Sequence, residues 1–149
     1  MRFSRIVLRG SVAGVAAGVL LGLFLKIVEN VFGIKVYTLL LNVDYIPILK
    51  EFPLPEIVEF SLHLIISVVV ATVLYYVVAR GEWSRGQMVF YVILLCSLLG
   101  VFLYPTTALS ERTPPIDSVS AIFFWLIGHT LYGGVLSLFY WKNKSKTYC

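Results

Sequence analysis

Residues 60–79 read FSLHLIISVVVATVLYYVVA and contain no Asp, Glu, Lys or Arg. A stretch of about 20 apolar residues is long enough to cross the hydrocarbon core of a bilayer as an α-helix. Three further stretches of this kind lie at about residues 6–28, 87–105 and 118–141. None alternates polar and apolar residues as the strands of a membrane β-barrel do. The sequence therefore predicts an all-α integral membrane protein, a bundle of four transmembrane helices in one membrane domain over residues 1–149.

The composition agrees with lipid as the solvent of the chain. Of the 149 residues, 59% are hydrophobic and only 13% are charged, whereas about a quarter of an average soluble domain is charged. The net charge of +4 does not indicate nucleic acid as a partner, because the basic residues stand at the ends of apolar runs and form no basic stripe. Cys96 and Cys149 are too few for a disulfide framework, so we expect free thiols. The expected partner is the lipid bilayer.

The positions of Lys and Arg predict the orientation of the bundle. Eight of the twelve basic residues lie before or within the first turn of the first span, between the second and third spans, or after the fourth. The remaining four lie at the opposite ends of the spans: Lys26, Lys35, Lys50 and Arg112. Because short cytoplasmic loops carry the excess of Lys and Arg, both termini are expected in the cytoplasm. The first apolar run is followed by no small-x-small cleavage site, which predicts a retained helix instead of a signal peptide.

Residues 29–59 form the one long connection between predicted spans. Most of it is apolar, and a fifth span is disfavoured by its polar and proline interruptions at Lys35, Asn42, Asp44, Pro47, Pro53 and Pro55. Irregular backbone at membrane depth is tolerated only where protein or water satisfies it. We therefore expect an interfacial or re-entrant segment that covers the outer mouth of the bundle.

Glycine occupies every fourth position of the first span, at Gly10, Gly14, Gly18 and Gly22. Such a stripe of small residues lets the backbone of another helix approach closely. Packing within the bundle is the favoured interpretation, and contact between copies in a homo-oligomer is the alternative. Four residues beyond the stripe, Lys26 is expected to pair with Glu29.

The second and fourth spans contain the two histidines of the chain. His63 shares one helical face with Glu56, Glu59 and Ser67, and His129 stands in the run WLIGHTLYGG at 125–134. Ionisable residues inside a membrane are costly and face the bundle interior or a water-filled cavity. Both helices enter from the same side, so both histidines are expected in the outer half of the bundle.

The candidate site is a polar cluster of Glu29, Glu59, His63 and His129. Imidazole and carboxylate groups can relay protons or bind a divalent metal. Interhelical hydrogen bonding by the histidines is favoured, proton or ion handling comes second, and a metal comes third because Glu-x-x-x-His is no recognised zinc motif. The sequence thus predicts no metal and no cofactor.

Enzyme motifs are absent from the sequence. It contains no Gly-x-Ser-x-Gly elbow, no Walker loop and no dinucleotide-binding fingerprint, so we expect no enzyme. Pro114 and Pro115 in the second outer loop indicate a rigid hydrated turn, with Asp117 or Ser118 capping the fourth helix. A lid or solute gate is the alternative interpretation of this loop.

Several motifs together resemble those of YagU-like bacterial inner-membrane proteins. They are GSVAGVAAG at 10–18 followed by Lys26 and Glu29, HLIISVVVA at 63–71, the stretch from YP at 104–105 to TPP at 113–115, and IGH at 127–129. The resemblance spans most of the chain outside residues 30–55. The matching positions are Glu29, His63, Pro105, Pro114, Pro115, Gly128 and His129. The resemblance implies a four-helix bundle in the bacterial cytoplasmic (inner) membrane, and it transfers no function because that family is uncharacterised.

Three functions remain open from the sequence. The leading hypothesis is a structural or accessory membrane protein with a polar cluster in the outer half of the bundle. The second is a proton-responsive element, or a transporter of ions or small solutes, that uses Glu59, His63 and His129. The third is a subunit that docks on a membrane-protein partner through the glycine stripe.

Overall fold

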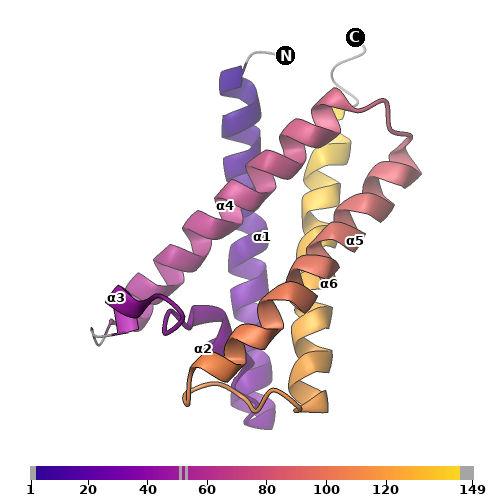
Figure 1. The fold of residues 1–149 in the computed structure, drawn as a ribbon. Helices are drawn as coiled ribbons and strands as arrows, with labels where there is room; N and C mark the ends of the chain where they lie inside the picture. Colours follow the sequence, from indigo (N-terminus) through magenta and orange to yellow (C-terminus); the bar gives the residue numbers. More distant parts are fainter. Residues whose placement is uncertain (1–2, 51, 53, 145–149) are drawn as a thin grey trace.

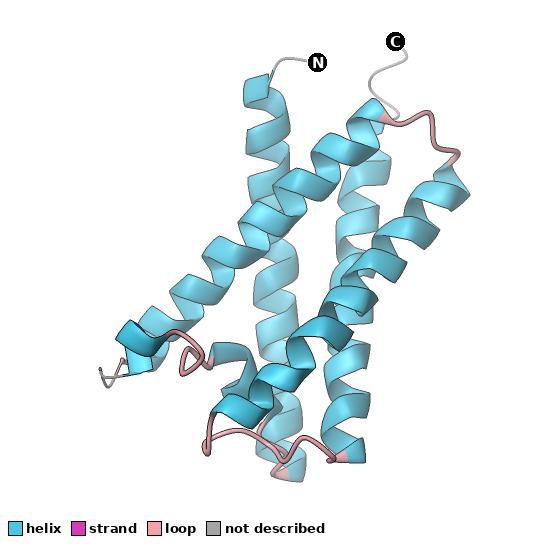
Figure 2. Ribbon diagram, viewed as in Figure 1, coloured by secondary structure: helices cyan, strands magenta, loops and turns pink. Residues whose placement is uncertain are grey.

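The computed structural model describes residues 3–50, 52 and 54–144, and within them the chain is helical and has no strand, as Figure 1 and Figure 2 show. The long helices are α1 (Phe3–Phe32), α4 (Glu56–Arg80), α5 (Arg85–Leu103) and α6 (Val119–Lys144). The short ones are α2 (Val36–Leu41), α3 (Pro47–Lys50) and the 3-10 helix η1 (Tyr104–Leu109). Four helices, with η1 counted as the continuation of α5, are long and apolar enough to cross a membrane. The predicted fold of four apolar helices is confirmed.

The helices run further than the apolar stretches that predicted them. At the end that carries α2 and α3, both α1 and α4 extend beyond the apolar stretch and include polar residues there. By contrast, α5 ends at Leu103, because Pro105 has no backbone N–H and its ring clashes with the preceding helical turn. The predicted cap of the last helix is present, since the Ser118 hydroxyl accepts a hydrogen bond from the Ala121 N–H at 3.4 Å.

The outside of the bundle is apolar. Ile57, Phe102 and Val119 are 70%, 75% and 79% exposed. In the most apolar windows of α4 and α5, only 22% and 28% of the residues are buried, whereas a helix of a soluble domain turns its apolar face inward. This surface fits lipid, as expected of a multi-pass membrane protein.

The bundle has two distinct ends. We call the end where α1 begins and α6 finishes the terminal end, and the end that carries α2, α3 and η1 the far end (Figure 1). The start of α1 and the end of α6 therefore lie at one end, as four spans require. Their cytoplasmic location stays a prediction.

The four long helices pack as two pairs. The most extensive contacts join α1 to α4 and α5 to α6, and α1 also packs against α6. Although a short loop connects them, α4 and α5 make hardly any contact with each other. In Figure 1, α4 crosses α1, and α5 crosses α6.

The glycine stripe forms the contact between α1 and α4. A Cβ atom at Gly10 would lie 2.6 Å from the Cα of Thr72, and one at Gly14 would lie 2.7 Å from the Cα of Val68. Real Cβ atoms do not approach other atoms this closely, so only glycine allows the two backbones to pack here. Gly18 and Gly22 also face α4, but a Cβ there would meet side chains, namely those of Ser67 and Leu64 at Gly18 and that of Phe60 at Gly22.

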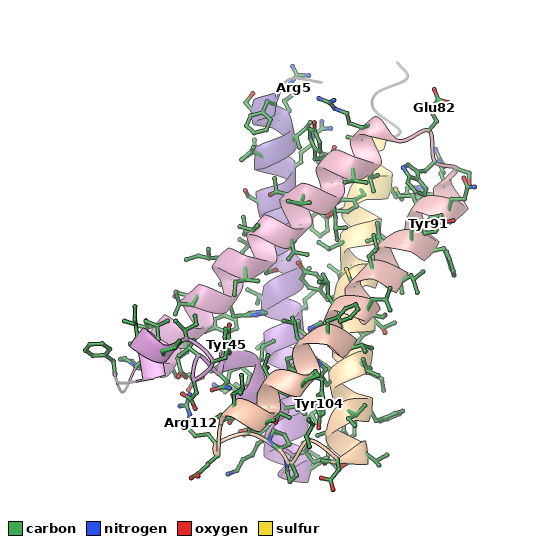
Figure 3. The ribbon with its side chains drawn as sticks, viewed as in Figure 1. Arg5, Tyr45, Glu82, Tyr91, Tyr104 and Arg112 are labelled. Carbon is green, nitrogen blue, oxygen red and sulfur yellow. The ribbon has the colours of Figure 1, made fainter. Side chains whose placement is uncertain are left out.

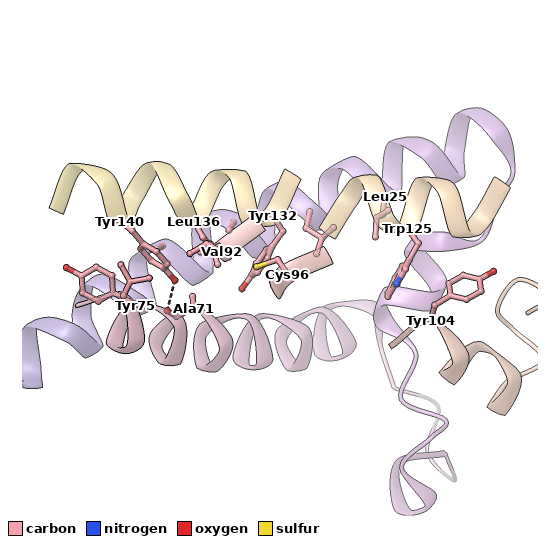
Figure 4. Close-up of a cluster of buried hydrophobic side chains, with 14 of the residues drawn as sticks. Leu25, Ala71, Tyr75, Val92, Cys96, Tyr104, Trp125, Tyr132, Leu136 and Tyr140 are labelled. Atoms are coloured by element: carbon pink, nitrogen blue, oxygen red, sulfur yellow. Dashed lines mark hydrogen bonds between the residues drawn. The ribbon is translucent and has the colours of Figure 1, made fainter. Parts of the chain in front are cut away.

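Tyrosines of α6 bridge the space to α4 in the core (Figure 4). The Tyr140 hydroxyl donates to the Ala71 carbonyl at 2.6 Å, and the Tyr132 hydroxyl donates to the Ser67 carbonyl at 2.9 Å. The Ser67 hydroxyl in turn lies 2.7 Å from the carbonyl of Gly14 on α1. These hydrogen bonds tie α1, α4 and α6 together inside the membrane.

The cysteines and the C-terminal tail are described only in part. Cys96 is a buried free thiol on α5, which confirms the prediction for this residue. Cys149 and Lys146 lie outside the described residues.

Candidate functional site

The connection after α1 folds over the far end of the bundle. Gly33 has a φ of +70°, a left-handed conformation that suits glycine and ends α1, and its N–H donates to the Glu29 carbonyl at 2.9 Å. The chain then forms α2, which packs against α1, α4 and α6 and buries Val36 and Leu39. The segment is not a fifth span, and its interfacial or re-entrant position in a bilayer stays a prediction.

Glu29 holds the start of α2 in place. Its carboxylate accepts hydrogen bonds from the Thr38 N–H at 2.8 Å and from the Thr38 hydroxyl at 2.7 Å. The first N–H groups of a helix have no partner within the helix, and the helix dipole favours a negative charge there. A carboxylate of α1 therefore supplies the cap that α2 lacks in its own sequence.

Lys26 pairs with Glu56 of α4. The Lys26 Nζ lies 2.6 Å from the Glu56 Oε1, and the Tyr37 hydroxyl donates to the same oxygen at 2.9 Å. The ammonium also stands 5.1 Å from the centre of the Tyr37 ring. The predicted pair of Lys26 with Glu29 is wrong, because Thr38 already engages Glu29 while α4 brings another carboxylate within reach.

Arg112 links the loop after η1 to two other segments. Its Nη2 lies 3.0 Å from the Glu59 Oε1, and its Nε lies 3.4 Å from the Asp44 Oδ2. The hydrogen bond to Glu59 raises the pKa of the guanidinium most, partial burial lowers it, and the charges of Glu59 and Asp44 raise it further. The sequence indicated only a hydrated turn for Arg112, and no local motif reveals its partners. Figure 3 labels Arg112 at the far end.

The proline loop is held by hydrogen bonds. The Thr107 hydroxyl donates to the Pro114 carbonyl, and the Tyr104 hydroxyl donates to the Pro115 carbonyl at 3.1 Å. Thr107 and Thr113 are buried. This loop is therefore a fixed platform from which Arg112 extends.

The two histidines lie deeper in the bundle than the charged groups. The His63 ring is centred 5.9 Å from the Phe60 ring and interacts with the backbone of Gly18 on α1. Its Nε2 is buried and has no hydrogen-bond partner among the residues that the structure describes. The His129 Nδ1 lies 2.9 Å from the Trp125 carbonyl oxygen. No described hydrogen bond joins the two imidazoles.

The predicted cluster of four residues therefore divides into two layers. Glu29 and Glu59 belong to a charged layer at the far end, where Thr38 and Arg112 hold them. His63 and His129 form a second layer one helical turn or more below. Helical spacing places Glu59 and His63 one turn apart, but it does not reveal that Arg112 engages the carboxylate.

A cavity of about 310 Å³ opens in the charged layer. It lies among α1, α2, α4 and the loop after η1, and its lining consists of Lys26, Glu29, Asn30, Tyr37, Thr38, Leu41, Glu56, Glu59 and Arg112. We call this cavity the far-end pocket. Across the described part of the chain, no three His, Cys, Asp or Glu side chains are grouped so that they can hold a metal ion. The pocket is thus a site of mixed charge built on carboxylates, two cations and one tyrosine.

No protein-family model, curated protein or solved structure matches the chain. The resemblance to YagU-like proteins, the bacterial origin and the inner-membrane location stay predictions.

Proposed function

We propose that this protein is a non-enzymatic, multi-pass membrane protein that responds to protonation at its far end, with His63 as the titrating group. One observation carries the proposal, namely the buried and unpartnered Nε2 of His63. A polar atom without a partner inside the hydrocarbon layer costs several kcal/mol. One of the two nitrogens of a neutral imidazole can accept a proton. A proton is therefore the smallest ligand that this atom can bind.

The far-end pocket offers the proton a path to His63. Glu59 lines the pocket and lies one helical turn above His63 on α4. His63 itself stands about 10 Å along α4 from Glu56, at 1.5 Å per residue. Glu59 stands one helical turn away on the same helix, His129 faces His63 from α6, and α1 presents the backbone of Gly18.

The interior below His63 supports a response to protons over conduction across the bundle. The hydroxyls of Ser67, Tyr132 and Tyr140 are engaged in hydrogen bonds between helices. A proton that arrives from the far end meets a closed layer at this depth. We further propose that the far end faces outward, as the distribution of basic residues predicts, so that external acidification is the stimulus.

The test is a histidine NMR titration of the purified protein in nanodiscs from about pH 4 to pH 8. We expect His63 to titrate reversibly, with a midpoint that shifts in Glu59→Gln and His129→Gln, and with accompanying shifts in resonances of α1 and α4. In His63→Gln these accompanying shifts should disappear. Unchanged shifts in His63→Gln, or a His63 that stays neutral throughout, would refute the proposal.

Sealed proteoliposomes separate a response from transport. Proton uptake above that of empty liposomes, lost in His63→Gln, would indicate transport through the bundle. No uptake together with a normal titration would indicate a sensor.

A structural or accessory bundle is the second candidate, and the bridges from Tyr132 and Tyr140 to α4 favour it. In that case His63→Gln should change neither the titration behaviour of the other groups nor any cellular response to acid. Docking of a partner through the glycine stripe is less favoured, because the stripe is packed against α4. A docking subunit would need another surface.

A further inference from the structure

We infer that the far-end pocket binds a small organic cation with an ammonium group, either free in solution or carried by a lipid headgroup. The inference does not depend on the proton response proposed above, because it concerns the charged layer and not the histidines.

The charge of the pocket favours a cation. Three carboxylates line it, from Glu29, Glu56 and Glu59, against two cations, Lys26 and Arg112. With all five ionised, the lining is left with a negative charge that one ammonium group neutralises. Burial raises the pKa of the Tyr37 hydroxyl most, and the neighbouring carboxylates, Glu56 first, raise it further.

The structure already contains an ammonium group that is held by a carboxylate and an aromatic ring of the far-end pocket. The Nζ of Lys26 lies 2.6 Å from the Glu56 carboxylate and 5.1 Å from the centre of the Tyr37 ring. A carboxylate together with an aromatic face is the usual environment for a bound ammonium. The side chains of Lys26 and Glu56 are 45% and 57% exposed, so water can replace their ion pair at little cost. Lys26 is therefore a tethered occupant that a free ammonium can displace.

The size and donor geometry of the pocket point to an organic cation instead of a metal. A volume of about 310 Å³ lies at the lower end for small-molecule sites. Leu41 adds apolar lining for a short alkyl chain. In the described residues, the carboxylates are not grouped as a metal ion requires.

The first experiment measures the binding of ethylammonium to the protein in nanodiscs at neutral pH, by calorimetry and by thermal unfolding. Lys26→Ala removes the tethered occupant and should bind ethylammonium about tenfold more tightly than the unmodified protein, a change typical of one strong ammonium contact. Adding Glu56→Gln to Lys26→Ala should abolish that gain. The matched control is Lys35→Ala, which removes an exposed cation outside the pocket lining and should bind like the unmodified protein.

A second pair of variants tests the aromatic ring of Tyr37 without altering Lys26. Tyr37→Phe keeps the ring and should retain most of the affinity, whereas Tyr37→Leu should lose it. The inference is wrong if Lys26→Ala gains no affinity, if Tyr37→Phe and Tyr37→Leu bind equally well, or if sodium chloride at the same concentration stabilises the variants as much as ethylammonium does. Repeating the titration in the His63→Gln background should give the same result, which separates this inference from the proton response.

The source of the ammonium is distinguished by lipid composition. If phosphatidylethanolamine supplies it, nanodiscs of that lipid should weaken the binding of free ethanolamine relative to nanodiscs of phosphatidylglycerol. If the ligand is a free amine, the two affinities should agree. An absence of ethanolamine binding in both lipids would overturn the inference.

Discussion

Polar groups in the interior of the bundle differ between a hydroxyl layer, formed by Ser67, Tyr132 and Tyr140, and the histidine layer, formed by His63 and His129. Toward the terminal end, the hydroxyls of Ser67, Tyr132 and Tyr140 all bridge helices by hydrogen bonds. Toward the far end, the Nε2 of His63 is buried and makes no described hydrogen bond. The hydroxyl layer holds α4 to α6 where their backbones stay apart, whereas the histidine layer keeps a titratable atom available. The satisfied hydroxyls indicate structure here. The buried atoms without a described hydrogen bond also include Thr72 Oγ1 and Asn42 Nδ2, but the imidazole is the one that titrates near neutral pH, and it therefore indicates function.

The largest expected effect comes from the packing on which both layers depend. Gly14→Ala places a methyl group 2.7 Å from the Cα of Val68 and should lower the free energy of unfolding by about 2 to 3 kcal/mol. Gly134→Ala is the matched control, because its Cβ meets nothing within 4 Å, and it should be neutral or gain up to about 1 kcal/mol. Denaturant titration in detergent micelles measures both. Equal stabilities would show that the close approach of α1 and α4 contributes little.

The hydroxyl layer should show a smaller loss. Tyr132→Phe removes the bridge to Ser67 and keeps the ring, so we expect a loss of about 1 kcal/mol in the free energy of unfolding. Tyr91→Phe serves as the control, since Tyr91 is an exposed tyrosine of α5. The contrast between the layers fails if both variants are as stable as the unmodified protein.

The two histidines should differ from each other in the same measurement. His129→Gln removes a hydrogen bond to the Trp125 carbonyl and should cost about 1 kcal/mol. His63→Gln replaces an unpartnered nitrogen with another polar group at the same position, so it should change stability by less than about 0.5 kcal/mol. A large loss in His63→Gln would assign that residue to the structural layer and weaken the proposed function.

A small effect is also expected at the surface of the far end. Arg112→Gln breaks contacts to Glu59 and Asp44, but the Arg112 side chain is 48% exposed, so we expect a loss of about 1 kcal/mol or less. The difference from the unmodified protein should shrink in about 1 M salt, because ions screen exposed charges. A loss that is independent of salt would mean that Arg112 acts through packing.

The sequence predicts the helices well because each apolar stretch carries its own information. The glycine stripe and the Ser118 cap are local patterns. In the structure the stripe packs against α4, and Ser118 caps α6. The partners of Glu29 and Lys26 follow from α2 and α4 meeting at the far end, which no spacing within one helix encodes. Arg112 is the clearest case, since its carboxylate partners come from segments distant along the chain.

The pairing of α1 with α4 and of α5 with α6 bears on how the chain is made. Synthesis proceeds from the N-terminus, so α4 enters the bilayer when its main partner is already there. The same is true of α6, whose main partner α5 immediately precedes it. Each pair can therefore close as soon as its second helix leaves the ribosome. The hydrogen bonds from Tyr132 and Tyr140 to α4 then form last, so they join two halves that are already assembled.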